Sequence, residues 1–388
     1  MSIGASFRPP ESRLVVDAEV AVVGAGVVGS AVALALARRG VAVVLLEAEA
    51  EPGLAASGTN SGILHTGFDS HPGELETELI LRSAVLRDAV LGALDVPALR
   101  CGALLRPRAA GDLEAVQGLA ANARRNGVET RMHEDGALEV PGEAVTDPVA
   151  YTLGLAAAAE RHGAQVRTRF RVAGLEQARD ELVLSEAGGE SIRSRLLVNC
   201  AGLYADDVAR LAGDDSFNIY PRKGEFLVFE PPAGERLERI LLPVPTKRTK
   251  GVLVFPTIDG MAVAGPTAVD MSDKDDWSVR PEACDAILPK ARAMWPQLEG
   301  LEPVAAYAGL RPAGLGVNYV IGRSPSCPRL VNVAAIRSTG MTASLGIAER
   351  VCTIVEGMGV ALGPEQPLAA GSSAAPAVLW WRRTAERV

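Results

Sequence analysis

The first apolar segments of the chain alternate with a cluster of glycines. Residues 18–23 are a short valine-rich run, residues 27–38 are an apolar, alanine-rich stretch, and residues 41–46 are a second run of valine and leucine. Short apolar runs bounded by turn residues are typical of central parallel strands. The pattern predicts a strand, a tight turn, a buried helix and a second strand. The uncharged stretch 20–37 only touches the lower length limit of a membrane-spanning helix, and its glycines favour the same interpretation.

The glycine cluster has the spacing of a dinucleotide-binding turn. Gly24, Gly26 and Gly29 form a G-x-G-x-x-G, and Glu47 ends the second predicted strand. The first glycine permits the turn, the second lets the backbone approach a pyrophosphate, and the third allows close packing of helix and strand. The helix N-terminus then faces the phosphate charge, and the carboxylate of Glu47 accepts hydrogen bonds from a ribose diol. These residues predict a site for an ADP-containing dinucleotide.

Two later segments also place small residues after a predicted strand. Residues 195–199 read as a strand that ends at Cys200-Ala201-Gly202, and residues 330–334 as a strand followed by a loop and a helix over 343–355. Small residues at the carboxyl edge of a sheet let the backbone approach a ligand. The start of that helix would bring its dipole to the same ligand, although Thr342 suits a plain helix cap equally well.

Composition and charge narrow the possible functions. The net charge is -8 and the pI is about 5.3, so the chain has no basic footprint for nucleic acid. The five cysteines are scattered without a C-x-x-C, and the four histidines lack metal-ligand spacing. We therefore expect no disulfide framework and no metal site. A reducing, cytoplasmic location fits, because residues 1–17 contain no apolar signal-peptide core.

The segment after Glu47 favours FAD over NAD. A loop of glycine, alanine and serine, residues 53–62, ends in Ser57-Gly58-Thr59-Asn60-Ser61-Gly62. Such small residues can approach a second phosphate and an isoalloxazine ring without steric conflict. A flexible surface loop is the alternative, but the apolar pair Ile63-Leu64 indicates a segment that turns back inside.

Residues 57–82 resemble the corresponding stretch of the FAD-dependent glycerol-3-phosphate dehydrogenases and L-2-hydroxyglutarate dehydrogenases, members of the D-amino-acid oxidase superfamily. The resemblance continues in family order through Asp147-Pro148 with Tyr151, 155–166, 198–206, 221–226, 265–268, 273–275, 307–312 and 338–344. It implies a mixed α/β fold with a discontinuous, Rossmann-like FAD-binding domain and a mostly antiparallel β-sheet substrate domain. The FAD-binding domain is expected from residues 1–85, 145–215 and 325–370, the substrate domain from 86–144 and 216–324, and a C-terminal tail from 371–388.

The resemblance also implies non-covalent FAD, since Cys327 does not match the position where some amine oxidases bond their flavin. Val172 is expected against the adenine on the resemblance alone, because an ordinary edge strand explains its sequence equally well. The residues expected to bind FAD are Gly24, Gly26, Gly29, Glu47, Ser57, Thr59, Asn60, Ser61, Gly62, Val172, Ala201, Gly202, Gly340, Met341 and Thr342.

His65 and Arg311 are the main candidates for the chemistry. Histidine exchanges protons near neutral pH, and the family has a histidine at the position of His65; the alternative is a structural histidine bonded to backbone. Arg311 offers a planar fork for a carboxylate or phosphate, and the matching family arginine faces the substrate; a surface salt bridge is the alternative.

The family carries a further basic residue near the pocket, which corresponds to Lys223 or its neighbour Arg222. Lys223 is placed in a predicted turn that precedes a strand over 226–229, and the sequence leaves open which of the two side chains points inward. Tyr307 and Tyr319 are additional candidates to line the site.

These residues predict oxidation of a small anionic secondary alcohol, such as L-2-hydroxyglutarate or sn-glycerol 3-phosphate. A hydride would pass to flavin N5, and His65 would accept the hydroxyl proton. Oxidation of an amine or amino acid on the same fold is the alternative, because fold alone does not set chemistry. A flavin-binding protein without turnover is a third interpretation, against which the joint presence of His65 and Arg311 speaks. The electron acceptor, whether oxygen, quinone or another, stays open.

The last segment contains Trp380-Trp381 beside Arg382-Arg383, after a linker-like stretch, 369–377. Tryptophan next to arginine is typical of a bilayer surface, which predicts at most a weak peripheral contact with the inner face of a membrane. A helix packed on a partner subunit, or a frayed terminus, is the alternative.

Overall fold

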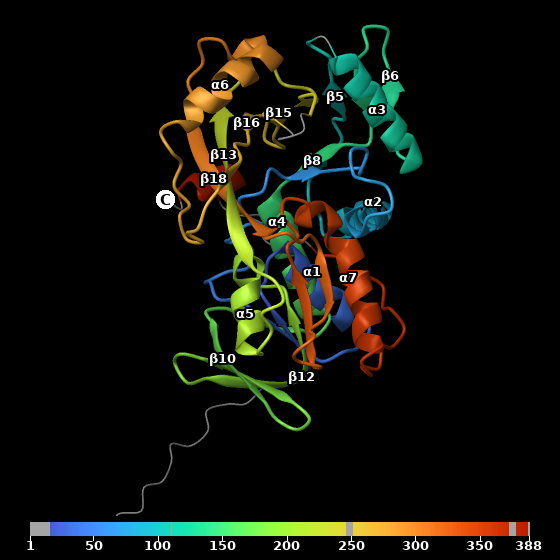
Figure 1. Ribbon diagram of the computed structural model, residues 1–388, viewed down its shortest axis with the longest axis vertical. Helices are drawn as coiled ribbons and strands as arrows, with labels where there is room; N and C mark the ends of the chain where they lie inside the picture. The colour runs from blue at the N-terminus through green and yellow to red at the C-terminus, as the bar shows by residue number, and fades with distance from the viewer. Residues whose placement is uncertain (1–15, 110, 246–250, 372–377, 387–388) are drawn as a thin grey trace, which may run out of the picture.

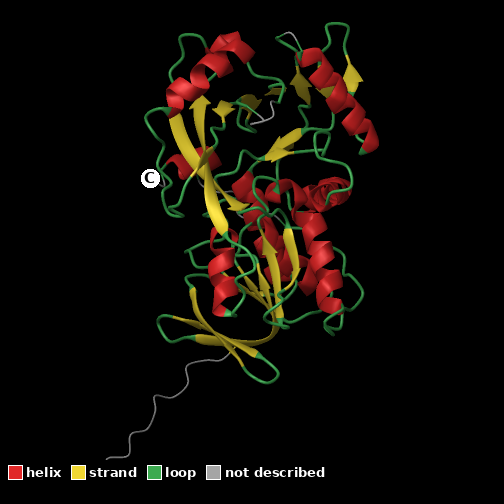
Figure 2. Cartoon of the chain, viewed as in Figure 1, coloured by secondary structure: helices red, strands yellow, loops and turns green. Residues whose placement is uncertain are grey.

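The computed structural model describes residues 16–109, 111–245, 251–371 and 378–386. Most of the predicted linker 369–377, and nearly all of the segment in which no signal peptide is expected, lie outside these residues. The chain forms two bodies stacked along the long axis of the molecule, one rich in helices and parallel strands, the other built on a second sheet (Figure 2).

The first body is organised around an eight-stranded sheet whose central strands are parallel. Its strands are β1 Val16–Val23, β2 Val43–Leu46, β9 Gln165–Arg167, β10 Val172–Gln177, β11 Leu182–Glu186, β12 Ser191–Asn199, β19 Val320–Arg323 and β20 Leu330–Ala334. The neighbours β9, β2, β1, β12 and β20 run parallel, and β10, β11 and β19 add antiparallel partners. Every residue of β2 and β20 is buried, as expected for strands covered on both faces.

Helices cover this sheet. They are α1 Val27–Ala37, α2 Leu75–Ala93, α4 Pro148–Arg161, α5 Ala205–Leu211 and α7 Gly340–Glu356, with the short 3₁₀ helix η1 Gly202–Tyr204. Helix α1 packs against both α4 and α7 because most of its residues are small or aliphatic and buried on all sides. Helix α4 begins after Asp147, whose side chain accepts hydrogen bonds from the N–H groups of Val149 and Ala150. The sequence did not predict α2.

The second body contains a nine-stranded sheet. Its strands are β5 Ala103–Leu105, β6 Arg131–Met132, β7 Leu138–Val140, β13 Ile219–Phe229, β14 Ile240–Leu242, β15 Leu253–Pro256, β16 Ala262–Gly265, β17 Val269–Asp270 and β18 Ala305–Gly314. All pairs are antiparallel except β5 with β14. The helices of this body are α3 Asp112–Arg125, α6 Ala283–Met294 and the 3₁₀ helix η2 Pro296–Leu298.

The turn predicted around Arg222 and Lys223 is wrong. These residues lie inside β13, which continues without interruption and pairs residue by residue with β18, so that Arg222 is opposite Arg311. Consecutive side chains of a strand point to opposite faces, and Arg222 and Lys223 therefore face different sides of the sheet.

A small sheet lies between the two bodies. It consists of β3 Ile63–Leu64, β4 Ala98–Leu99 and β8 Ala144–Thr146, with β8 antiparallel to both partners. Figure 1 shows β8 between the level of α3 and α6 and the level of α1, α5 and α7. The pairing of β3 with β8 brings the residues after β3 close to the residues before β8.

The predicted mixed α/β class is confirmed by this arrangement of a largely parallel and a largely antiparallel sheet. The chain ends in the short helix α8 Trp380–Ala385. Among the residues that the structure describes, none of the helices combines the length and apolar character needed to cross a bilayer.

Candidate active site: two adjoining cavities

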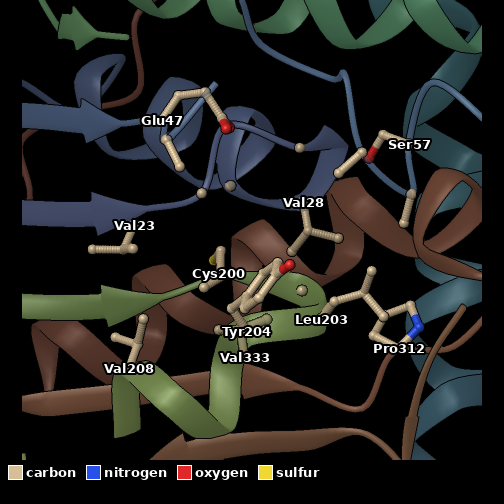
Figure 3. Close-up of a pocket in the computed structure, with 18 of the residues that line it drawn as sticks. Val23, Val28, Glu47, Ser57, Cys200, Leu203, Tyr204, Val208, Pro312 and Val333 are labelled. Atoms are coloured by element: carbon tan, nitrogen blue, oxygen red, sulfur yellow. The ribbon is translucent and has the colours of Figure 1, made fainter. Parts of the chain in front are cut away.

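The first cavity opens at the carboxyl ends of the parallel strands and has a volume of about 420 Å³. Figure 3 shows Val23, Glu47 and Cys200 at the ends of three neighbouring strands, with Ser57 on the other side of the cavity. Of the predicted cofactor residues, those that line this cavity are Gly24, Gly26, Gly29, Glu47, Ser57, Asn60, Val172, Ala201, Gly202, Gly340 and Met341. The carboxyl edge of such a sheet is the usual place for a ligand in open α/β folds.

Two of the glycines are required by the local geometry. Gly24 has a φ of +97°, and a Cβ atom there would lie 2.4 Å from the carbonyl oxygen of Cys200. A Cβ atom on Gly29 would lie 1.9 Å from the carbonyl oxygen of Gly24. The turn between β1 and α1 can therefore approach the neighbouring chain only without side chains, which explains the spacing found in the sequence.

Glu47 is a fixed acceptor at the end of β2. Its two carboxylate oxygens accept hydrogen bonds from the N–H groups of Ala25 and Glu49, at 2.8 Å and 2.9 Å. Burial raises the pKa of Glu47, and the backbone hydrogen bonds oppose that rise. Each carboxylate oxygen keeps a further lone pair, so that the group can also accept from the hydroxyls of a ribose.

Two helices begin at the first cavity. The N-terminal residues of α1 and α7 line it, and neither helix has an acidic residue in its first turn or a side-chain cap from its own N-cap residue. At the N-terminus of α1, one of the unpaired N–H groups is satisfied by Ser57, whose hydroxyl oxygen accepts the N–H of Val27 at 2.9 Å. Helix N-termini present unpaired N–H groups and positive dipole ends, which favours an anionic ligand here.

The second cavity is larger, about 600 Å³, and adjoins the first. The two share Ala56, Asn60 and Arg337 in their linings. His65, Arg222 and Arg311 line the second cavity, together with Thr59 and Ser61 of the loop 53–62. Neither lining includes Gly62 or Thr342.

His65 is paired with a buried carboxylate. Its Nδ1 lies 2.9 Å from Oε2 of Glu143, whose side chain is fully buried. The other carboxylate oxygen of Glu143 accepts hydrogen bonds from the N–H and the hydroxyl of Thr66, at 2.6 Å and 2.8 Å. Because Thr66 fixes the carboxylate, Glu143 favours the imidazole tautomer that carries its proton on Nδ1.

The backbone around this pair is held from two sides. The hydroxyl of Thr342 accepts the N–H of His65 at 3.1 Å and donates to the carbonyl of Ile63. The guanidinium of Arg87 on α2 donates to the carbonyls of Leu64 and His65 through Nη1, and to that of Gly142 through Nη2. Thr342 thus supports His65 rather than lining either cavity.

Arg311 presents a partly buried positive charge at the wall of the second cavity. Its Nε and Nη2 donate to the carbonyls of Arg222, Lys223 and Thr267. Within the described ranges, its Nη1 has no hydrogen-bond acceptor and its charge has no ion-pair partner. Burial and the charge of Arg222 lower the pKa of Arg311 to about 10, so the side chain is cationic at neutral pH.

Arg222, and not Lys223, faces the second cavity. Arg222 forms two hydrogen bonds with the carboxylate of Asp270, at 2.5 Å and 2.9 Å. The side chain of Lys223 is fully buried on the other face of β13, where its ammonium contacts Asp276 at 2.8 Å and the carbonyl of Ser278 at 2.9 Å. The expectation that Lys223 reaches the substrate is therefore corrected, because strand alternation turns it away.

The two candidate tyrosines do not line either cavity. Tyr307 is fully buried and stacks on Phe226, with ring centroids 4.8 Å apart. Tyr319 is buried, and its hydroxyl lies 2.7 Å from that of Thr339. Both serve the packing of the protein.

The tail tryptophans are also placed differently from the prediction. Trp380 and Trp381 are each only 2% exposed and pack into the core that contains Tyr307 and Phe226. Nε1 of Trp381 donates to Asp259 at 2.9 Å. Indole rings buried in the protein cannot lie at a bilayer surface, so the basis for the predicted membrane contact is lost.

The sequence did not indicate the roles of Glu143 and Arg87, nor that the side chain of Arg222 faces the second cavity. Glu143 lies 78 positions after His65, and no local pattern connects them. Segment 137–149 also contains Glu139 and Asp147, so the sequence does not single out Glu143 among these acids.

The two cavities fit the FAD that the sequence predicts. The first supplies an acceptor for a ribose, two helix N-termini for a pyrophosphate and a glycine turn that admits close approach. The loop 55–61 then leads into the second cavity with side chains no larger than asparagine. Among the described residues there is no group of three or more histidine, cysteine, aspartate or glutamate side chains that could hold a metal ion.

Comparisons with known proteins identify the family of the chain. The chain is 28% identical over 354 residues to a glycerol 3-phosphate dehydrogenase of Caloramator mitchellensis, which covers 87% of this chain and 74% of that protein. It is 29% identical over 277 residues to the mitochondrial L-2-hydroxyglutarate dehydrogenase of Mus musculus, which covers 64% and 60%. The fold matches an L-α-glycerophosphate oxidase from Mycoplasma pneumoniae with FAD bound, with a TM-score of 0.84 and 24% identity over 93% of this chain and 100% of that one. Residues 19–354 match the DAO family model, and the chain therefore belongs to this family of FAD-dependent oxidoreductases.

Proposed function

We propose that this flavoenzyme oxidises the secondary alcohol of a small anionic substrate, a 2-hydroxy acid or sn-glycerol 3-phosphate. The observation that carries the proposal is the second cavity, where His65, backed by Glu143, and Arg311 line one space that adjoins the dinucleotide cavity at Asn60. FAD bound in the first cavity would supply the oxidant that takes up the hydride of the carbinol carbon.

His65 is the group that accepts the hydroxyl proton. With Nδ1 directed at Glu143, the proton-accepting position of the neutral ring is Nε2. Once the ring is protonated, the buried carboxylate of Glu143 stabilises the imidazolium. Thr342 and Arg87 hold the backbone of His65, which keeps the ring in place while the substrate enters.

Arg311 holds the substrate's anionic group. Its three carbonyl partners fix the guanidinium without neutralising it, and the nearby carboxylate of Asp270 is already engaged by Arg222. A partly buried cation without a carboxylate partner is incompletely solvated, and an incoming carboxylate or phosphate compensates for the lost solvation with charge-assisted hydrogen bonds. Arg222 adds positive potential from the opposite strand position.

The relatives' names support an alcohol rather than an amine. The proteins with 28% and 29% identity are named for the oxidation of glycerol 3-phosphate and of L-2-hydroxyglutarate, an anionic alcohol in each case. Both alcohols carry the anion within a few bonds of the carbinol, which suits a cavity that has a base and a guanidinium in its lining.

The test is anaerobic reduction of the bound flavin. The purified holoprotein is mixed without oxygen with sn-glycerol 3-phosphate, L-2-hydroxyglutarate, other 2-hydroxy acids and amino acids, and the visible flavin band is followed. We expect one class of anionic alcohol to bleach the flavin, and neutral alcohols of the same size to fail. Bleaching by an amino acid and by none of the alcohols would overturn the proposal.

A further inference from the structure

The C-terminal helix α8 connects the second body with the loop that closes the dinucleotide cavity. Trp380 lies edge-on against Tyr307 of β18, with ring centroids 5.6 Å apart, and Trp381 donates to Asp259 in the turn between β15 and β16. These contacts anchor one side of the helix in the core of the second body. The other side of α8 faces a different part of the chain.

On that other side, α8 contacts the segment 51–60, which we call the flavin loop. The hydroxyl of Thr384, a buried residue, lies 2.8 Å from the carbonyl oxygens of both Gly58 and Trp380, and its one proton is shared between these two acceptors. The guanidinium of Arg383 forms an ion pair with the carboxylate of Glu51. Thus a loop that follows β2 of the first body is tied to a helix anchored on the second.

The flavin loop is held by its own turn bonds and by a few bonds to other segments, such as the N–H of Gly53 on the carbonyl of Ala25. Its inner residues are small, and its own bonds are mostly turn contacts, such as the N–H of Gly58 on the carbonyl of Ala55. Yet Ser57 caps α1 at Val27, and Asn60 lines both cavities. Gly58 lies between Ser57 and Asn60 in the sequence. The conformation at Gly58, which Thr384 contacts, therefore determines where both of these residues lie in the wall of the cofactor site.

We propose that α8 is a clamp for the cofactor: by holding Gly58 and Glu51, it keeps the flavin loop in the conformation that retains FAD. Thr384 acts as a positioning residue, because it reaches the cofactor site only through the loop. The proposal rests on FAD binding, which the family establishes, and is independent of the substrate.

Coupling between the helix and the cofactor must act in both directions. If α8 raises the affinity for FAD, then bound FAD stabilises the docked state of α8 by the same factor. The backbone amides of residues 380–385 should therefore exchange hydrogen more slowly in the holoprotein than in the same protein after FAD has been removed. A helix that only stabilises the fold would slow no more than helices that contact neither cavity, because bound FAD stabilises the folded state as a whole.

The experiment compares Thr384→Val, which keeps the size of the side chain and loses the donor, with Thr384→Ser, which keeps the hydroxyl. Dissociation of FAD is followed by the rise of flavin fluorescence after dilution of each holoprotein, and the dissociation constant is obtained by titrating FAD back. We expect Thr384→Val to weaken FAD binding about fivefold, the factor that corresponds to one net hydrogen bond, and Thr384→Ser to bind as the wild type does. Glu386→Gln, an exposed change at the C-cap of the same helix, is the matched control.

A chain that ends before residue 378 should lose FAD faster than Thr384→Val, and hydrogen exchange of α8 in the full chain should slow on FAD binding. The proposal is overturned if Thr384→Val keeps the wild-type affinity for FAD while exchange of α8 is the same with and without FAD. The proposal is also overturned if Thr384→Val lowers the unfolding temperature equally in the holoprotein and in the protein without FAD. That result would mean that α8 contributes only to the overall stability of the protein.

Discussion

Replacing Glu143 by glutamine tests how His65 is held ready to accept a proton. In the structure one carboxylate oxygen of Glu143 accepts two hydrogen bonds from Thr66, and the other faces Nδ1 of His65. The glutamine oxygen would stay with the two donors of Thr66, which turns its NH₂ group toward the ring. Nδ1 must then accept a hydrogen bond, the ring proton moves to Nε2, and Nε2 can no longer take a proton from the substrate.

The expected loss is large. Removing one partner of a buried charge pair costs about 3–5 kcal/mol, and here that cost falls on the imidazolium state that follows proton transfer. Since about 1.4 kcal/mol corresponds to a factor of ten, the rate of flavin reduction should fall by about 10² to 10⁴. Substrate binding should change much less, because the contacts of Arg311 are untouched.

The assay is anaerobic stopped-flow reduction of the bound flavin under saturating substrate. Glu139→Gln is the matched control, because Glu139 pairs with His133 at 3.1 Å on the exposed surface of the second body. A double variant, His65→Ala with Glu143→Gln, should be no slower than His65→Ala alone, since the two residues act as one unit. If Glu143→Gln binds FAD normally and reduces it at the wild-type rate, then His65 does not depend on this carboxylate and the reasoning is refuted.

Changes at three further places in the structure are predicted from the described contacts: at Arg311, at Gly24 and at the Lys223–Asp276 pair. Arg311→Met should raise KM for the anionic substrate by about 10- to 100-fold, with no rescue by Arg311→Lys, and steady-state kinetics checks this. The Gly24→Ala variant should purify without flavin, because its Cβ would lie 2.4 Å from a backbone carbonyl oxygen. The control Gly40→Ala places a Cβ that meets no neighbour within 4 Å and should keep FAD. The ratio of flavin absorbance to protein measures both outcomes. Lys223→Met should leave flavin reduction unchanged, while Asp276→Asn should lower the free energy of unfolding by about 1–3 kcal/mol. Lys223 lowers the pKa of Asp276 from 3.8 to about 2, so their contribution should be full above pH 3.8 and lost as the pH falls toward 2, which thermal unfolding against pH measures.

The dinucleotide end of the site could be predicted from the sequence because its signals are local. Gly24, Gly26, Gly29 and Glu47 belong to one strand–helix–strand unit, in which turn geometry and apolar pattern agree, and the structure brings them to one cavity. Glu47, the expected hydrogen-bond acceptor for the ribose, follows directly from its position at the end of the second strand of this unit.

The substrate end could be predicted only in part because its geometry depends on distant pairing. His65 and Glu143 meet where β3 pairs with β8, and the sequence contains no periodic signal for that contact. The choice between Arg222 and Lys223 depends on which face of β13 meets the cavity, and alternation alone does not tell which face that is. The family resemblance pointed to a basic residue at this place without fixing its direction.

The environment of the C-terminal tryptophans could not be predicted from the sequence either. Tryptophan beside arginine is compatible with a membrane surface and with a packed helix, and composition cannot separate the two. The structure decides by burying Trp380 and Trp381 against Tyr307 and Asp259, which lie far from them along the chain. Whether these side chains are exposed depends on contacts made by the whole fold, which the local sequence does not reveal.

The most direct test of the central claim is a primary deuterium isotope effect on the anaerobic reduction of the flavin. The alcohol that bleaches the flavin is prepared with deuterium on its carbinol carbon and mixed with the holoprotein in a single turnover. Our account predicts that the deuterated alcohol reduces the flavin several-fold more slowly, because the bond to that hydrogen breaks as the flavin is reduced. Equal rates for both alcohols, in a protein in which His65→Ala also reduces at the wild-type rate, would contradict it.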